Sequence, residues 1–169
     1  MNQSGKTKKS QAPEVIKQYL TFNIGHENYG LELSQTREII EYSGITEVPL
    51  MPNFLRGVIN LRGEVVPVID LAVRLGRKPI EVQKRTCIIV VELEINEQNH
   101  VLGLLADAVS EVLELDEANI EDAPSFGANI RADFIQGIAK RGDEFIVLLD
   151  ANSALSIREL AHLVEAQLQ

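Results

Sequence analysis

Short runs of alternating apolar and polar residues, separated by turn residues, recur along the chain. Between 18 and 24 the residues Leu20, Phe22 and Ile24 alternate with more polar positions, and a turn at 25–28 leads into a second apolar run at 29–33. This pattern predicts a β-hairpin, and the segment 86–106 predicts another, with its turn at 96–99. Short strands with turn signals between them are typical of small β-barrels or a sandwich.

The order of these elements occurs twice. The apolar segment 54–71, which contains two Arg-Gly pairs, returns as 134–150, and the Arg62-Gly63 pair returns as Arg141-Gly142. Earlier in each copy, Arg37-Glu-Ile-Ile40 has a counterpart in Ser110-Glu-Val-Leu113. Three further pairs are spaced by a constant 80 residues: Phe54 with Phe134, Gly57 with Gly137, and Asp70 with Asp150. Self-similarity of this kind predicts two similar barrels side by side.

Three further local signals refine this prediction. Ser34 is expected to cap a short helix that runs to Ile40, and Ser156-Ile-Arg-Glu159 is a capping box for a helix over 156–169 that should dock on the barrels. Pro67 interrupts the first copy of a strand that carries Val147 in the second copy. Because proline cannot donate a ladder hydrogen bond, we expect the first strand at a sheet edge or bulge.

Composition and charge narrow the class of protein. A chain of 169 residues with 45% hydrophobic and 24% charged residues is typical of one globular domain, and no apolar run approaches the roughly 18 residues of a membrane span. Residues 1–17 carry four lysines and one glutamate without the apolar core of a signal peptide, so we expect a disordered basic tail. The net charge of −9 therefore becomes −12 outside this tail, which argues against nucleic acid as the main partner.

The chain offers few groups for catalysis or metal binding. Its three histidines are not at metal-ligand spacing, and Cys87 lies in an apolar run, where a buried small residue is favoured over a nucleophile. The acidic segment 115–127 lacks the spacing of a calcium loop and is expected to be solvated. We therefore expect no enzyme, no metal and no cofactor.

Arginine, glycine and apolar surface remain, and these are the materials of protein interfaces. Arg62 lies in a tight turn that holds its guanidinium outward, where it could pair with a carboxylate of a partner or of this chain. A solvated turn arginine is an equally weighted alternative, because Arg141 occupies the equivalent place. Gly57 and Gly137, each three residues after a phenylalanine, are expected at bulges or close backbone approaches. Arg56, Asn60 and Pro67 occur only in the first copy, which makes them candidates for a partner-facing edge.

The pattern Phe54-x-x-Gly-x-x-Asn-Leu-Arg-Gly-x-x-x-Pro-x-x-Asp-Leu71, with Glu38-Ile39 and Asp107-x-Val-Ser-x-Val-Leu113, resembles the bacterial chemotaxis coupling proteins (CheW). The resemblance extends from Tyr19 to about Leu163. It implies a mainly β fold of two interwoven five-stranded SH3-like barrels with short connecting helices and a C-terminal helix. The single CheW-like domain would span 18–155, with halves of roughly 18–85 and 86–155, followed by the helix at 156–169.

The resemblance also implies a cytoplasmic, non-catalytic adaptor, recruited to membrane-associated arrays, that joins methyl-accepting chemoreceptors to the regulatory domain of a CheA-type histidine kinase. Carried over by position, the tip of the receptor would meet a groove that contains Glu38, Arg62, Ile88, Gly103 and Val112. The kinase would contact Ile45, Leu50 and Arg56, with Gly57 supporting that surface. Thr36 and Cys87 depart from the more strictly aliphatic residues usual in the family, which bears on affinity or receptor choice.

Alternatives of other kinds stay open at this point. The output could be flagellar rotation, pilus-based motility or another chemosensory branch. A small-barrel binder of a metabolite or nucleic acid is disfavoured by the aromatic content of 5%, because single-strand binders need stacking platforms and positive charge. An enzyme is disfavoured by the missing triads and metal sets.

Overall fold

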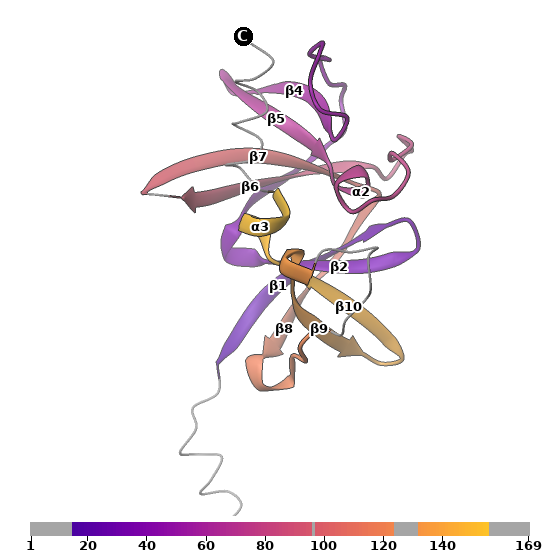
Figure 1. Ribbon diagram of the computed structural model, residues 1–169, viewed down its shortest axis with the longest axis vertical. Helices are drawn as coiled ribbons and strands as arrows, with labels where there is room; N and C mark the ends of the chain where they lie inside the picture. The colour runs from indigo at the N-terminus through magenta and orange to yellow at the C-terminus, as the bar shows by residue number, and fades with distance from the viewer. Residues whose placement is uncertain (1–14, 96, 124–131, 156–169) are drawn as a thin grey trace, which may run out of the picture.

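Two five-stranded sheets form the body of the protein (Figure 1) in a computed structural model that describes residues 15–95, 97–123 and 132–155. The first, called here the β1 sheet, has the strand order β8-β1-β2-β10-β9, and the second, the β6 sheet, has the order β3-β6-β7-β5-β4. Neighbouring strands are antiparallel except for the parallel pairs β2–β10 and β5–β7. The predicted mainly β fold of two small barrels is thus confirmed.

The β1 sheet consists of β1 (Ile16–Ile24), β2 (Glu27–Glu32), β8 (Ala108–Asp116), β9 (Ile135–Arg141) and β10 (Glu144–Leu149). The β6 sheet consists of β3 (Thr36–Glu41), β4 (Leu55–Leu61), β5 (Glu64–Asp70), β6 (Cys87–Ile95) and β7 (Gln98–Ala106). The helical segments within the described residues are η1 (Leu33–Gln35), α2 (Leu71–Arg74), η2 (Glu117–Asn119), η3 (Ala132–Phe134) and α3 (Ala151–Leu155).

Each sheet takes strands from both sequence repeats. The hairpin β1–β2 of the first repeat joins β8, β9 and β10 of the second, whereas the hairpin β6–β7 of the second repeat joins β3, β4 and β5 of the first. The barrels are therefore interwoven, and a boundary near residue 85 separates the two repeats but not the two sheets. Figure 1 shows the β6 sheet above the β1 sheet, with α3 between them.

A backbone bridge closes each sheet into a barrel. Beyond the edge strand β3, Thr46 exchanges two hydrogen bonds of 2.9 and 2.8 Å with Val58 of the opposite edge strand β4. Beyond β8, Glu121 makes the same exchange with Ile138 of β9, at 2.9 and 2.8 Å. Closure removes the free sheet edges that would otherwise invite pairing with other chains.

A glycine precedes each bridge residue and lets the two backbones meet. Gly57 has φ 147°, and a Cβ there would lie 2.6 Å from Ile45 Cγ2 and closer still to the carbonyl oxygen of Thr46. A Cβ at Gly137 would meet Ile120 Cγ2 and lie 3.0 Å from the carbonyl oxygen of Glu121. The close backbone approach predicted for both glycines is confirmed, and it is internal to each barrel.

One hydrophobic core is shared by the two sheets. Phe22 and Tyr29 of the β1 sheet, whose ring centroids are 6.1 Å apart, belong to the same buried cluster as Ile69, Ile88 and Leu104 of the β6 sheet. A second, smaller buried cluster lies inside the β1 sheet and contains Tyr19, Ala139, Ile146 and Leu148. Burial of this apolar surface is the main favourable contribution to holding the barrels together.

Two local predictions were wrong. Instead of a helix over 34–40, the chain makes the single turn η1 and then the strand β3, because backbone pairing of β3 with β6 outweighs the local capping signal. The strand with Pro67 is not at an edge, since β5 lies between β7 and β4. Pro67 is tolerated there because pairing with β7 begins only at Val68.

The predicted ends of the domain fall partly outside the description. Strand β1 begins at Ile16, so residues 16 and 17 of the expected tail are part of the sheet. Residues 1–14, the expected helix over 156–169 and part of the acidic segment (124–127) lie outside the described residues. Within that segment, Leu115 and Asp116 end β8, and η2 follows.

Replacement of Gly57 by alanine should destabilise the protein by about 3–4 kcal/mol, since it combines an unfavourable φ with a backbone clash. Gly63→Ala is a matched control: Gly63 also has a positive φ, 89°, but a Cβ there meets no atom within 4 Å. We expect the control to lose only about 1 kcal/mol. Urea unfolding of both variants measures the difference, and equal losses would contradict the role given to the close approach.

Candidate functional site

The Arg62-Gly63 turn joins β4 to β5 and presents Arg62 to a carboxylate on β3. Both turn residues have positive φ, 51° and 89°, which is typical of a two-residue type I′ hairpin turn, and the amide of Gly63 donates to Asn60 Oδ1 at 2.8 Å. The guanidinium donates to both carboxylate oxygens of Glu38, with Nη1 3.3 Å from Oε1. Since β3 and β4 are opposite edges of the β6 sheet, this ion pair also spans the closure of the barrel.

The two groups shift each other's proton affinity. The hydrogen bonds from Arg62 lower the pKa of Glu38, and the Glu38 carboxylate raises the pKa of Arg62. Arg62 is mostly exposed, with 65% of its side chain accessible. The pair is therefore a fixed, charged surface feature that a partner could contact without first having to order it.

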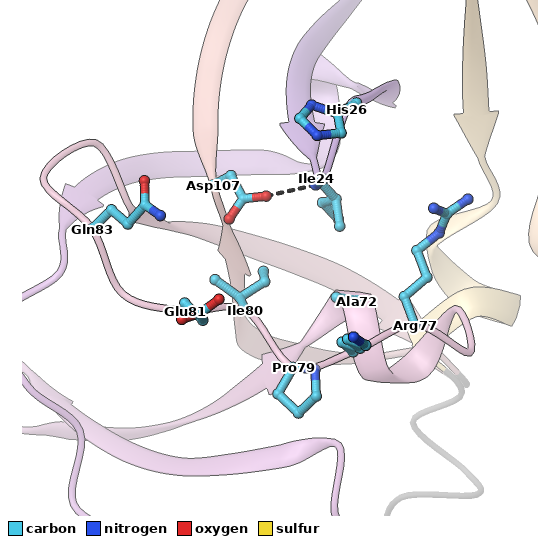
Figure 2. A pocket seen from close by; sticks show the side chains of 11 residues that line it. Ile24, His26, Ala72, Arg77, Pro79, Ile80, Glu81, Gln83 and Asp107 are labelled. Carbon is cyan, nitrogen blue, oxygen red and sulfur yellow. Dashed lines mark hydrogen bonds between the residues drawn. The ribbon is translucent and has the colours of Figure 1, made fainter.

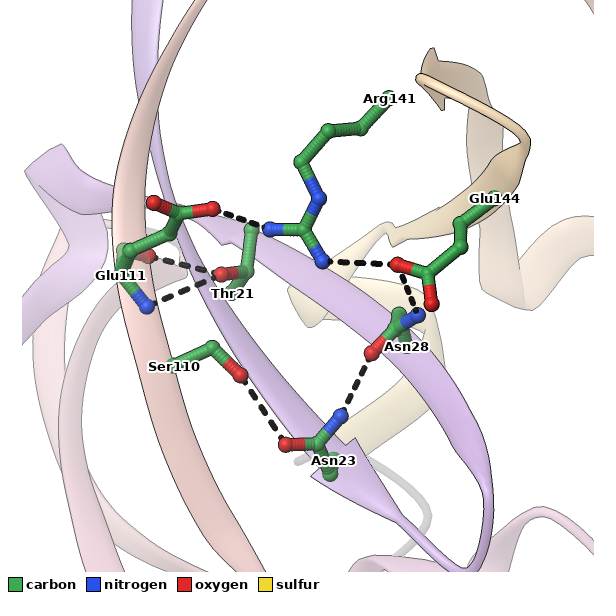
Figure 3. A network of polar contacts seen from close by, with 7 residues as sticks. All are labelled: Thr21, Asn23, Asn28, Ser110, Glu111, Arg141 and Glu144. Atoms are coloured by element: carbon green, nitrogen blue, oxygen red, sulfur yellow. Dashed lines mark hydrogen bonds and ion pairs between the residues drawn. The ribbon is translucent and has the colours of Figure 1, made fainter.

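The second repeat contains the same ion pair. Arg141, at the end of β9, pairs with Glu111 of β8 across the closure of the β1 sheet, and its other terminal nitrogen lies 3.2 Å from Glu144 Oε1. Figure 3 shows this network and its continuation across the sheet. The hydroxyl of Thr21 donates to the carbonyl oxygen of Glu111 at 2.8 Å, and the remaining links join Ser110, Asn23, Asn28 and Glu144. An arginine at this turn is thus part of the barrel architecture in both repeats.

The five receptor-groove candidates lie in three different environments. Glu38 and Arg62 meet at the surface. Ile88 is fully buried in the core, and Gly103 lies against it, because a Cβ at Gly103 would be 2.8 Å from Ile88 Cγ2. Val112 is half exposed on β8 of the other sheet. The structure brings the first two together and places Ile88 and Gly103 in the core of the same sheet.

Two exposed apolar residues on the strands around the Arg62 turn were missed. Ile39 follows Glu38 on β3, and Val65 of β5 pairs with Asn60 beside the turn, with exposed fractions of 44% and 70%. Neither strand alternates apolar and polar residues in its sequence, so no period-two pattern marked these outward-facing positions. We call Glu38, Ile39, Arg62 and Val65 the turn surface.

Three of the four kinase-contact candidates line one open depression. Ile45, Leu50 and Arg56 border a depression of about 590 Å³ beside the loop that precedes β4. Leu50 is 78% exposed and has φ 64°, a conformation that costs a non-glycine residue about 1–2 kcal/mol. Gly57 does not line the depression but fixes the loop behind it at Thr46. We call Ile45 and Leu50 the loop surface.

Arg56 has an internal partner. Its guanidinium donates to Asp70 Oδ2 at 2.8 Å and to the carbonyl oxygen of Ile80 at 2.9 Å. Asp70 is fully buried and also accepts from the amides of Ile80 (3.0 Å), Ala72 (3.0 Å) and Val73 (3.4 Å), so it caps α2 as well. Arg56 thus balances a buried carboxylate and ties the segment at Ile80 to the end of β5, which is a structural role.

Another depression, of about 460 Å³, lies where the β1–β2 turn meets the segment after α2 (Figure 2). His26, Arg77, Glu81 and Asp107 line it, and the amide of Gly25 donates to Asp107 Oδ2 at 2.6 Å. Elsewhere, Cys87 is buried, which raises the pKa of its thiol. Among the described residues, no three His, Cys, Asp or Glu side chains form a group that could hold a metal ion.

The described residues thus form two closed barrels with a charged turn at Arg62 and an exposed leucine, Leu50, on the loop before β4. The chain belongs to the CheW family: the family model of the CheW-like domain matches residues 18–159. None of the helices in the described part of the chain is long and apolar enough to cross a membrane.

Individual relatives agree with this assignment. The chain is 33% identical to the chemotaxis protein CheW of Klebsiella aerogenes over 147 residues, which cover 87% of this chain and 86% of the relative. It is 28% identical to protein FrzA of Myxococcus xanthus, with 82% and 84% of the two chains covered. The solved structure of the scaffolding protein TtCheW from Thermoanaerobacter tengcongensis aligns with a TM-score of 0.71 at 38% identity, over 80% of this chain and 90% of that one. The chain is a chemotaxis adaptor.

Arg56→Met should lower the free energy of unfolding by about 2 kcal/mol, because it leaves the buried carboxylate of Asp70 without its cation. Arg37→Met is the matched control: it breaks an exposed pair with Glu64, 3.7 Å long, and should cost less than about 0.5 kcal/mol. Urea unfolding compares the two variants. A loss below about 0.5 kcal/mol for Arg56→Met would mean that the backbone donors alone satisfy Asp70.

Arg62→Gln should raise the pKa of Glu38, because hydrogen bonds from Arg62 are the largest cause of its lowered value. The contribution of the pair to stability is present at neutral pH and is lost as the pH falls through the lowered pKa of Glu38. A carboxyl-carbon NMR titration measures this pKa. Arg37→Gln should raise it less, because Arg37 is the smallest of its causes; an unchanged value in Arg62→Gln would show that the pair does not persist in solution.

Proposed function

We propose that this chain joins the cytoplasmic tips of methyl-accepting chemoreceptors to the regulatory domain of a CheA-type histidine kinase, without catalysing a reaction itself. The observation that carries the proposal is the arrangement of two exposed surfaces on one rigid strand. The turn surface lies where β4 ends, and the loop surface lies before β4 begins. Ile45 lies beside Gly57 near the start of β4, so five extended residues, or about 16 Å, separate the nearer part of the loop surface from Arg62, which leaves room for two partners at once.

The turn surface is our candidate for the receptor. It combines an aliphatic pair, Ile39 and Val65, with the fixed ion pair of Glu38 and Arg62, and such a mixture of apolar contact and oriented charge suits a helical tip. Ile88 and Gly103 support it from the core of the same sheet, since Ile88 pairs with Ile40 and Gly103 packs against Ile88. Val112 contributes a further exposed aliphatic position on β8.

The loop surface is our candidate for the kinase. Leu50 exposes most of its side chain on a loop that the Thr46–Val58 bridge holds in place, so little conformational entropy remains to be lost on binding. Arg56 and Gly57 act behind this surface: Arg56 through Asp70, and Gly57 through the close approach to Thr46. Receptor binding would recruit the protein from the cytoplasm to membrane-associated arrays.

The pathway served is a second question. The other candidate output is the one that the sequence left open, a related chemosensory branch such as pilus-based motility. Both candidates use the same two contacts. Deletion of the gene, followed by separate assays of swimming and of surface motility, distinguishes them, since only the branch that is served should be impaired.

The two surfaces should be separable by mutation. Leu50→Ser should weaken binding of the kinase regulatory domain at least about tenfold, which corresponds to 1.4 kcal/mol, and leave receptor binding unchanged. Arg62→Ala should weaken binding of a receptor cytoplasmic fragment at least about tenfold, leave binding of the kinase regulatory domain unchanged and leave the fold intact. Isothermal titration against each purified partner measures both effects.

Val65→Ser is the matched control for Leu50→Ser, because both remove an exposed aliphatic side chain. It should affect only the receptor contact. Receptor-controlled kinase activity at the wild-type level in Arg62→Ala would remove Arg62 from the interface and leave it a purely architectural residue.

A further inference from the structure

One arginine lies between the equivalent phenylalanines of the two repeats. The Cζ atom of Arg74, at the end of α2, is 5.0 Å from the ring centroid of Phe54 and 4.9 Å from that of Phe134. Its Nε donates to the carbonyl oxygen of Ala154 in α3 at 2.8 Å. Phe54 precedes β4 of the β6 sheet, whereas Phe134 precedes β9 and Ala154 follows β10 of the β1 sheet, so Arg74 connects the two barrels.

Each ring is fixed to its own barrel. The carbonyl oxygen of Phe54 accepts from the amide of Asp70 at 2.7 Å, and that of Phe134 accepts from the amide of Asp150 at 2.8 Å. Asp70 is the last residue of β5 and Asp150 directly follows β10, and each accepts from an amide of the helix that follows, at Val73 (3.4 Å) and Ser153 (3.2 Å). The rings are also almost fully buried. Their positions therefore report the positions of the strand ends.

The arrangement is symmetric except for the cation. Residue 154 is the repeat equivalent of Arg74, and it is an alanine. A single guanidinium therefore serves both aromatic faces and a carbonyl oxygen, which its planar shape allows, because both faces of the plane can stack while its edge donates. A lysine ammonium is a compact charge on a flexible stem and cannot reproduce this geometry.

We propose that Arg74 is a positioning residue that fixes the orientation of one barrel relative to the other. The shared apolar core holds the barrels together, but apolar burial is not directional. The guanidinium over the two rings and its hydrogen bond to Ala154 supply direction. Among the candidate receptor contacts, the turn surface lies on the β6 sheet and Val112 lies on β8 of the β1 sheet, so this fixed angle keeps the two parts of the receptor contact in register; this last step rests on the proposed function.

Distances between spin labels test the orientation directly. Cysteines at Val65 and Phe145, which are exposed and lie in equivalent strands of the two sheets, carry the labels in a Cys87→Ala background. Arg74→Met should at least double the width of the distance distribution measured by pulsed electron spin resonance, and Arg74→Lys should broaden it by an intermediate amount. An unchanged width in Arg74→Met would overturn the proposal.

Arg37→Met is the control, because Arg37 of β3 pairs with Glu64 of β5 within the β6 sheet, so its loss breaks an arginine ion pair that does not connect the barrels. It should leave the width unchanged, and equal broadening would overturn the specific role of Arg74. If Arg74→Met does not fold, Phe134→Leu takes its place: it keeps the cation and an apolar side chain but removes one aromatic face, and it should broaden the distribution too.

Reconstituted signalling tests the consequence. In Arg74→Lys, the affinity for the receptor fragment and the receptor control of kinase activity should each fall at least fivefold, while the affinity for the kinase regulatory domain stays within twofold. A residue that served stability alone would lower the melting temperature and leave this control unchanged, and that result would overturn the positioning role. If the wild-type protein binds neither partner, the proposed function fails, while the spin-label distances still decide the role of Arg74.

Discussion

The close approach of two backbones at Gly57, and again at Gly137, is the constraint on which the rest of the structure depends. Without it, the residues after β3 could not bridge to β4, and both barrels would be open sheets with free edges. Closure is also what brings Glu38 within reach of Arg62, since the two lie on opposite edge strands. The charged turn is therefore a product of closure.

Asp70, at the end of β5, links the closure of one barrel to the position of the other. Asp70 is buried, yet each of its oxygens accepts hydrogen bonds, and Arg56 balances its charge. This satisfies the requirement that a buried carboxylate be paired and hydrogen-bonded. Because Asp70 also caps α2, it determines where Arg74 lies, and Arg74 in turn meets elements of the other barrel. A charge buried for one barrel thus helps to position both.

Much of this architecture could be predicted from the sequence because repetition is visible at single residues. The spacing of Phe54, Gly57 and Asp70 from their counterparts identified two barrels, and the glycines marked the close approach. What could not be predicted was decided by pairing between distant segments. The residues after Ser34 carry a helical signal, but β6 supplies a partner strand with which they form a sheet. Pro67 is tolerated inside the sheet because its neighbour β7 pairs only from Val68 onward.

The candidate site was harder to predict, because the presence of an arginine does not determine whether its guanidinium faces the protein interior or the solvent. Arg56 and Arg62 are six residues apart on the same hairpin, and both were candidates for partner contacts. One guanidinium faces a buried aspartate and the other a glutamate at the surface, and a bulge between Leu55 and Gly57 lies between the two arginines. The glycine signalled this bulge, but the sequence did not show to which side it would turn each arginine. The exposed apolar neighbours of Arg62 separate it further from Arg56.

The equivalence of Arg62 and Arg141 also shows why architecture and interface need not compete at one residue. Both arginines tie opposite edges of a sheet, so the closure role is common to the repeats. Arg141, however, holds two glutamates and is 30% exposed, whereas Arg62 holds one and is 65% exposed. Because a guanidinium has five donors in a fixed fork, the more exposed one keeps donors directed at solvent after closing its barrel. The first barrel is thus the one whose closing arginine can also meet a partner.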